Sequence, residues 1–124
     1  YLYVAFSCND QDIHSSFTQR DEHLWEEEAV EVFIDTDDEL NNYVELEVSP
    51  KNILYDSYIV DPVKIDVPET LKYNLKAVKT AVKVNGTVNS RKDKDQNWTV
   101  EMAIPFKSLR YADSKTWGVG ILHF

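Results

Sequence analysis

Apolar and polar residues alternate in several short segments of this 124-residue chain, most clearly over residues 29–35. There Val30, Val32 and Ile34 occupy every second position, and Glu31 stands between them. Successive side chains of a strand point to opposite faces, so this pattern predicts a strand with one buried face. We expect further strands with a similar pattern over residues 2–8, 43–49, 53–59, 98–104 and 117–124.

Residues 75–84 fit two interpretations. Their apolar positions suit a helix face and also a strand face: Leu75, Val78, Val82 and Val84. The pair Asn85-Gly86 follows directly, between β-branched residues, and this pair is typical of a two-residue hairpin turn. We therefore predict a strand that turns at Asn85-Gly86 into a further strand at residues 87–88.

The segments between these strands are polar turns and two long loops, over 13–28 and 61–73. One helical turn is expected over residues 106–109, after Pro105 ends a strand. Short strands at fairly regular spacing without a clear helix predict an all-β fold. The expected architecture is an antiparallel β-sandwich, jelly-roll-like, with residues 1–124 as a single domain. Alternation already runs at Leu2 and continues to Phe124, so we expect the domain to be excised from a longer chain.

Charge and composition exclude several classes of function. The formal net charge is -9, which argues against binding the phosphate backbone of nucleic acids. No apolar run approaches the length that crosses a membrane, and no membrane partner is expected. Cys8 is the only cysteine, so the chain holds no internal disulfide, and its strand position favours a buried thiol.

Acidic residues crowd one part of the chain. Ten Asp or Glu residues and no Lys or Arg lie between Asp21 and Glu39. Their mutual repulsion calls for a cation, a basic neighbour or a polyhydroxyl ligand. Eight of the thirteen Lys and Arg residues lie between Lys64 and Lys94, so a basic segment facing the acidic one is one possible answer.

A metal ion is another possible answer. Asp35, Asp37 and Glu39 alternate as ligands do in oxygen-rich calcium loops, so they are candidate ligands of a structural calcium ion. The glycine of the helix-loop-helix calcium motif is missing, and a solvated acidic turn is the alternative interpretation. The three histidines have no zinc-like spacing.

Six stretches resemble the family 9 carbohydrate-binding modules: residues 2–6, 12–13, 20–21, 24–35 (LWEEEAVEVFID), 42–50 and 98–106. The resemblance runs over nearly the whole chain. It implies a β-sandwich of the kind appended to secreted bacterial glycoside hydrolases, with sugar as ligand and calcium as a structural ion.

The resemblance also implies a site. Sugar-binding members clamp the ligand between two Trp side chains, while charged and amide groups bind its hydroxyls. Trp25 and Glu31 match one wall and one acceptor of this arrangement, Trp117 is the candidate second wall, and Arg20 is a further polar contact. From the residues alone, Trp25 could instead cap the edge of the sandwich.

These observations lead to two hypotheses of function. The first is a non-catalytic carbohydrate-binding module of a larger protein, secreted, periplasmic or at the cell surface, with covalently linked neighbouring domains. The second is an accessory structural sandwich without a ligand of its own. Glu31 with Glu45 or Glu47 could form a glycosidase pair, but exposed carboxylates pair often by chance, so we expect no enzyme.

Overall fold

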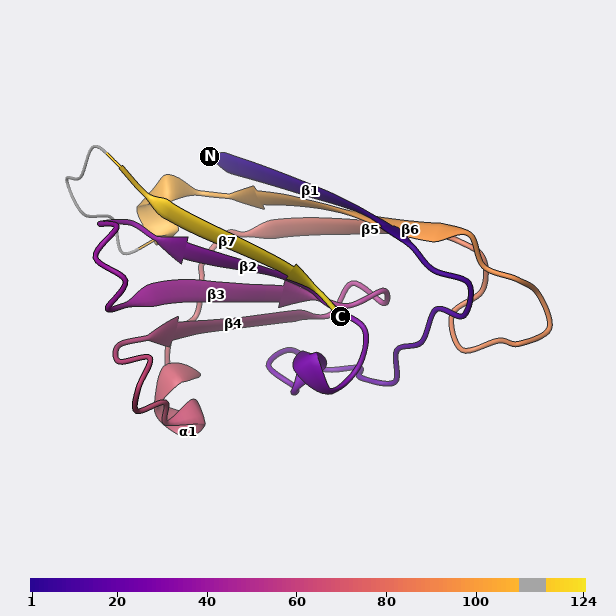
Figure 1. Cartoon of the computed structure of the whole chain (residues 1–124), viewed down its shortest axis with the longest axis horizontal. Helices are drawn as coiled ribbons and strands as arrows, with labels where there is room; N and C mark the ends of the chain where they lie inside the picture. The colour runs from indigo at the N-terminus through magenta and orange to yellow at the C-terminus, as the bar shows by residue number, and fades with distance from the viewer. Residues whose placement is uncertain (110–115) are drawn as a thin grey trace.

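A computed structural model describes residues 1–109 and 116–124 as two antiparallel β-sheets packed against each other (Figure 1). One sheet has the strand order β1 (Leu2–Asn9), β6 (Asn97–Ile104), β5 (Lys79–Asn85). The other has the order β4 (Leu54–Ile59), β3 (Tyr43–Val48), β2 (Val30–Asp35), β7 (Gly118–His123). The predicted all-β antiparallel sandwich is confirmed.

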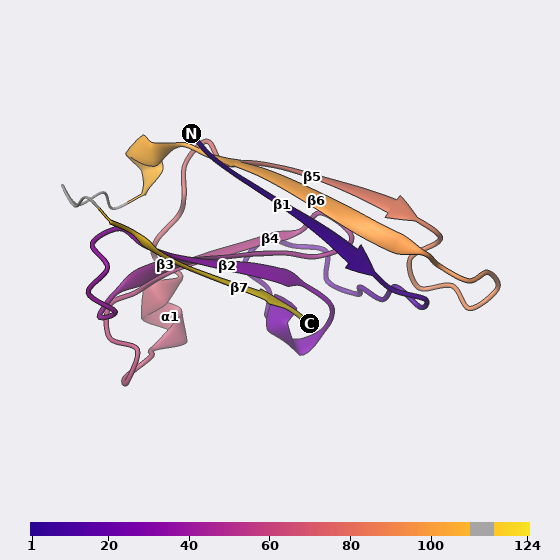
Figure 2. The ribbon, with the colours of Figure 1, turned by 45° about the horizontal axis from the view of Figure 1, so that its top comes forward.

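The core lies between the two sheets and follows the alternation of the sequence. β2 and β3 contribute Val30, Val32, Ile34, Val44, Leu46 and Val48, and β6 contributes Trp98, Val100, Met102 and Ile104. All of these side chains are buried, so the burial of their apolar area stabilises the pairing of the sheets. Figure 2 shows the three-stranded sheet lying over the four-stranded one.

Helical structure is short and lies at the edges of the sandwich. The loop after β1 contains the 3-10 turn η1 (Leu24–Glu26), and the turn η2 (Phe106–Ser108) confirms the helical turn expected after Pro105. One turn of α-helix, α1 (Val67–Thr70), was not predicted, and the carboxylate of Asp66 caps it by accepting the backbone N–H of Glu69. No helix among the described residues has the length and apolar character needed to cross a membrane.

The edge strands of the three-stranded sheet differ in character. The β5 edge exposes Lys79 and Lys83, charges that discourage pairing with another chain. The β1 edge exposes Tyr1 and Tyr3 instead, with their rings stacked at 6.0 Å.

The predicted hairpin at Asn85-Gly86 is wrong, although residues 79–85 do form a strand. β5 pairs with β6 so that Asn85 lies opposite Asn97, and residues 86–96 form a long connection. The buried carboxylate of Asp95 accepts the backbone N–H groups of Thr87 and Ile13, each at 2.7 Å. Residues 87–88 are therefore drawn to this carboxylate and do not begin a strand.

Gly86 makes this loop possible and offers a test of it. Its φ of 148° disfavours other residues, and a Cβ there would lie 2.0 Å from Oδ1 of Asp95. We predict that Gly86→Ala lowers the free energy of unfolding in urea by roughly 1–3 kcal/mol. The matched control is Gly120→Ala, whose Cβ would meet Phe33 at an ordinary 3.4 Å and should cost less than about 0.5 kcal/mol. Equal effects of the two substitutions would contradict this account of the loop.

Candidate functional site

The outer face of the four-stranded sheet, turned away from the core, carries the polar positions of β2 and β3. Strand pairing sets Glu31 opposite Glu47, and Glu47 in turn opposite Tyr55 of β4. The next pair on the same face, two residues from Glu31 and from Glu47, is Phe33 opposite Glu45. Residues two apart on a strand share a face, and diagonal neighbours on adjacent strands are within reach of long side chains. The three glutamates therefore converge.

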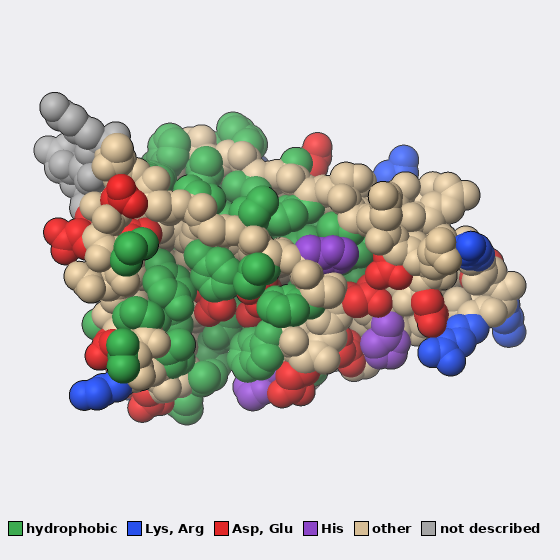
Figure 3. All heavy atoms as spheres, viewed as in Figure 1, with side chains coloured by type: hydrophobic (Ala, Val, Ile, Leu, Met, Phe, Trp, Pro, Cys, Tyr) green, Lys and Arg blue, Asp and Glu red, His purple; other side chains and the backbone are tan. Residues whose placement is uncertain are grey.

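Glu31, Glu45 and Glu47 form what we call the glutamate triad. Each offers a carboxylate oxygen, and these oxygens lie within 4.8 Å of one another. Glu31 is 3% exposed and Glu47 is 0% exposed, while Glu45 is half-buried. Figure 3 shows acidic side chains enclosed by hydrophobic ones over the strands of this sheet. The triad is thus part of the protein interior, although it lies outside the main core.

Few donors serve the triad. The hydroxyl of Ser57 donates to Glu45 at 2.9 Å. Both oxygens of Glu47 are buried without a hydrogen-bond partner in the described parts of the chain. None of the ion pairs among residues 1–109 and 116–124 includes a triad member.

The charged forms of these glutamates are correspondingly unfavourable. Burial, then the charges of Glu31 and Glu45, raises the pKa of Glu47 to about 9. The backbone N–H of Trp25 lies close enough to oppose this rise without completing a hydrogen bond of good geometry. Burial and the Glu45 charge raise the pKa of Glu31 to about 7, and burial also raises the pKa of Glu45. The triad therefore binds protons readily unless a cation or a set of donors reaches it.

Aromatic rings flank the triad on its Tyr55 side. The ring of Trp25, in η1, meets Tyr55 edge-on with centroids 5.2 Å apart. His23 stacks on the indole at 4.4 Å and covers one of its faces. The His23 side chain is itself about half exposed, so this stack presents a polar ring to solvent.

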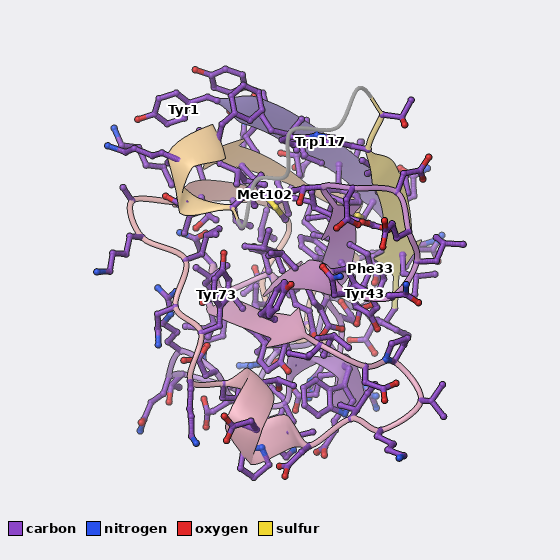
Figure 4. All side chains as sticks on the ribbon, turned by 90° about the vertical axis from the view of Figure 1, so that its left-hand side faces the viewer. Tyr1, Phe33, Tyr43, Tyr73, Met102 and Trp117 are labelled. Carbon is purple, nitrogen blue, oxygen red and sulfur yellow. The ribbon has the colours of Figure 1, made fainter. Side chains whose placement is uncertain are left out.

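A groove lies on the other side of Glu45. Phe33 and Tyr43 meet edge-on at 5.6 Å, and Figure 4 shows them side by side. They line a cavity of about 470 Å³ together with Asp35, Leu40, Gly118, Val119 and Gly120. The glycines of β7 carry no side chain over the sheet, so the aromatic rings stay accessible from that side.

The sequence model of the family described as "Carbohydrate family 9 binding domain-like" matches residues 1–123. The chain belongs to this family. The resemblance carried by the sequence is thereby confirmed over almost its whole length. No curated protein sequence matches the chain.

A solved structure shares the fold of this family 9-like domain. It is a crystal structure, at 2.70 Å resolution, of a candidate carbohydrate-binding protein from Bacteroides uniformis ATCC 8492, with a TM-score of 0.52 and 17% sequence identity. The match covers 86% of this chain and 45% of that one, so the domain spans about half the length of its structural neighbour. At this identity the likeness supports the β-sandwich and nothing finer.

Two of the four sugar-site residues predicted from the sequence lie on the same face. Trp25 contacts Tyr55, which lies beside Glu47 and hence beside Glu31. Arg20 lies elsewhere, because its guanidinium pairs with the buried carboxylate of Asp56. Asp56 alternates with Tyr55 along β4 and so points to the opposite face of the sheet.

Trp117, the candidate second wall, also lies away from this face. Its ring packs against the core cluster and meets Phe106 edge-on at 5.6 Å. Figure 4 shows it apart from Phe33 and Tyr43, on the side of the three-stranded sheet. A clamp of Trp25 and Trp117 around one sugar is therefore not the arrangement that this geometry favours.

The candidate calcium ligands lie in the turn after β2. The carboxylate of Asp35 accepts the backbone N–H groups of Asp37, Asp38 and Leu40 at 2.8–3.1 Å. These hydrogen bonds lower the pKa of Asp35 and occupy both of its oxygens. Among the described residues, the glutamate triad is the one group whose potential ligand oxygens lie close together. Asp35, Asp37 and Glu39 do not converge in this way. Calcium at this turn stays a prediction.

Several other carboxylates of the acidic segment 21–39 accept hydrogen bonds from backbone N–H groups. Glu22, Glu27 and Glu28 accept N–H donors from residues 14–19 and so fold the long loop after β1. No ion pair of the described residues joins the acidic segment 21–39 to the basic segment 64–94. The predicted charge pairing of the two segments is therefore not what relieves the repulsion.

Sequence reasoning considered Glu45 and Glu47 only as catalytic partners of Glu31. The signal for the triad was nonetheless present. Residues 29–35 and 43–49 are strands joined by a short polar turn, and neighbouring antiparallel strands usually pair. Pairing with both apolar faces inward places all three glutamates on one outer face.

The high pKa of Glu47 gives a test of the site. Between its ordinary value of 4.5 and its value of about 9, the folded state holds a proton that the unfolded state has lost. The free energy of unfolding must therefore fall as pH rises through this window. Glu47→Gln removes this titration at nearly constant size, so the variant should match the wild type near pH 5. At pH 8 we expect it to be more stable by roughly 1–3 kcal/mol.

The measurement is urea denaturation from pH 5 to pH 8 in the presence of chelator. Glu101→Gln, at an exposed position of β6, is the matched control and should keep the wild-type pH dependence. A Glu47→Gln variant with the same pH dependence as the wild type would show that Glu47 is not buried as a carboxylate.

Proposed function

We propose that this chain binds carbohydrate on the outer face of the four-stranded sheet, in the groove of Phe33 and Tyr43 beside Glu45. The observation that carries the proposal is the combination of half-buried aromatic rings that line a groove and carboxylate acceptors on one face. A sugar ring packs its apolar C–H face on an aromatic ring and donates its hydroxyls to carboxylates. Membership in the family supports this ligand class.

Within the triad, Glu45 is the acceptor that a sugar reaches first. It is half-buried, whereas Glu31 and Glu47 are almost fully covered. Glu31 was predicted as a direct acceptor, but it is only 3% exposed. Trp25 and its stacked His23 lie at the other end of the triad, where a longer oligosaccharide would make a second aromatic contact.

We further propose that the domain is a non-catalytic module of a larger secreted, periplasmic or cell-surface protein, such as a glycoside hydrolase. Two observations support this: the family 9 resemblance, and the greater length of the structural neighbour, of which the match covers 45%. Deletion of the module would then weaken binding of the parent protein to its polysaccharide and leave its turnover of small soluble substrates unchanged.

Tyr43→Ala tests the groove. Loss of the ring removes a stacking surface, so we predict that the dissociation constant for a bound oligosaccharide rises at least about tenfold, or about 1.4 kcal/mol. The measurement is calorimetric titration with the oligosaccharide that binds most tightly in a panel of plant and microbial glycans. Tyr3→Ala, at an exposed position of β1, is the matched control and should leave the affinity unchanged.

Two results would contradict the proposal in different ways. If Trp25→Ala weakens binding while Tyr43→Ala does not, the sugar lies over η1 and the groove is misassigned. If the folded chain binds no glycan of the panel, the domain is the accessory sandwich without a ligand.

A further inference from the structure

The glutamate triad raises a question that sugar binding does not answer. Three carboxylates from β2 and β3 meet within 4.8 Å, and two of them are almost completely shielded from solvent. A pyranose in the groove reaches Glu45 but cannot contact an atom that is fully covered. Whatever neutralises the inner part of the triad must therefore be smaller than a sugar.

Other buried carboxylates of the chain show what a satisfied acid looks like here. Asp95 accepts two backbone N–H groups, and Asp35 accepts three. Asp56 pairs with Arg20 and accepts the backbone N–H of Leu75. Each of these three buried carboxylates is thus matched by donors, as the cost of leaving a buried charge unmatched requires.

Glu47 departs from this rule. Its side chain is 0% exposed, points into the triad, and has no hydrogen-bond partner on either oxygen in the described parts of the chain. A buried acceptor without a donor destabilises the folded state, because it loses its hydrogen bonds to water and gains none in return. This unpartnered side chain is independent of the clustering itself and indicates a missing electropositive group.

The donor set identifies the class of that group. The triad offers only carboxylate oxygens, without nitrogen or sulfur ligands, and carries up to three negative charges. Such a set suits a hard divalent cation that accepts six to eight oxygens at 2.3–2.6 Å in flexible geometry, as calcium does. Burial raises the pKa of each triad member, which agrees with a site whose charge is not compensated by the protein.

We propose that Glu31, Glu45 and Glu47 bind a divalent cation of the calcium type on the outer face of the sheet. The hydroxyl of Ser57, bonded to Glu45, holds the outermost ligand in place. This site differs from the turn of Asp35, Asp37 and Glu39, where backbone N–H groups already occupy the Asp35 oxygens. The inference does not depend on sugar binding.

Terbium luminescence tests the site without any sugar present. Trp25 and Tyr55 lie beside the triad, so they can sensitise emission from a Tb³⁺ ion bound there. We expect saturable sensitised emission from the wild type, displaced by calcium, and a rise in melting temperature on addition of calcium. Glu47→Gln should weaken Tb³⁺ binding at least tenfold. It removes an unmatched charge, so the variant is expected to remain folded.

The matched control is Asp37→Asn in the acidic turn, which should change Tb³⁺ affinity less than twofold. If Asp37→Asn abolishes the emission and Glu47→Gln does not, the cation lies in the turn and the triad proposal is wrong. If the wild type shows neither emission nor a calcium-dependent melting shift, the triad holds protons and the proposal is likewise wrong.

The two proposals fail separately. A chain that binds Tb³⁺ through Glu47 but no glycan contradicts only the carbohydrate function. A chain that binds a glycan equally with calcium and with chelator, and shows no Tb³⁺ emission, contradicts only the cation site.

Discussion

The pairing register of β2 and β3 is the constraint on which the candidate site depends. Val30, Val32 and Ile34 pack into the core against the other sheet, and this fixes which face of β2 points outward. A slip of one residue would exchange the two faces and expose the apolar set. The six buried apolar side chains of β2 and β3 contribute roughly 1.5–3 kcal/mol each. Two charged carboxylates about 4 Å apart repel by about 4 kcal/mol at the effective dielectric constant of a protein surface, and a bound proton removes that repulsion. The core therefore holds the three glutamates together against their repulsion.

Acidic residues in this chain serve two different purposes. In the loop after β1 and the turn after β2, carboxylates accept backbone N–H groups and shape segments that lack regular structure. On the outer face of the sheet, the backbone N–H groups are already engaged in strand pairing and are not available to the side chains. The buried carboxylates of the triad therefore have too few hydrogen-bond donors within the protein. A bound ligand is the remaining source of positive charge or hydrogen bonds.

Features that depend on neighbouring residues in the sequence were predictable, and features that depend on contacts between distant residues were not. Apart from the strand expected at residues 87–88, the strands were predicted correctly, because alternation along a strand reports directly on the core. The prediction of a hairpin at Asn85-Gly86 was wrong because the carboxylate of Asp95, eight residues beyond Thr87, accepts the backbone N–H of Thr87. The spacing of Asp35 in the sequence resembles that of a metal ligand, yet its carboxylate accepts backbone N–H groups of the turn that follows it. A local pattern does not show which donors a side chain will meet.

The same limit applies to the site residues. Trp25 and Glu31 were found through the family motif, and the structure places them on one face. Trp117 and Arg20 were also expected from the resemblance, but each has a partner elsewhere: Trp117 lies against Phe106, and Arg20 pairs with Asp56. Burial of Glu47 depends on what covers the outer face, which alternation alone does not reveal.

The most direct test of this account is a ¹³C NMR titration of the glutamate side-chain carboxyl groups, carried out with chelator present. The account predicts that Glu47 titrates near pH 9 and Glu31 near pH 7, far above the ordinary value of 4.5. Both groups should remain ionised to lower pH when a saturating cation is added. If Glu31, Glu45 and Glu47 all titrate close to 4.5 in chelator, the triad is solvated, and the central claim of a buried, unmatched acidic site is contradicted.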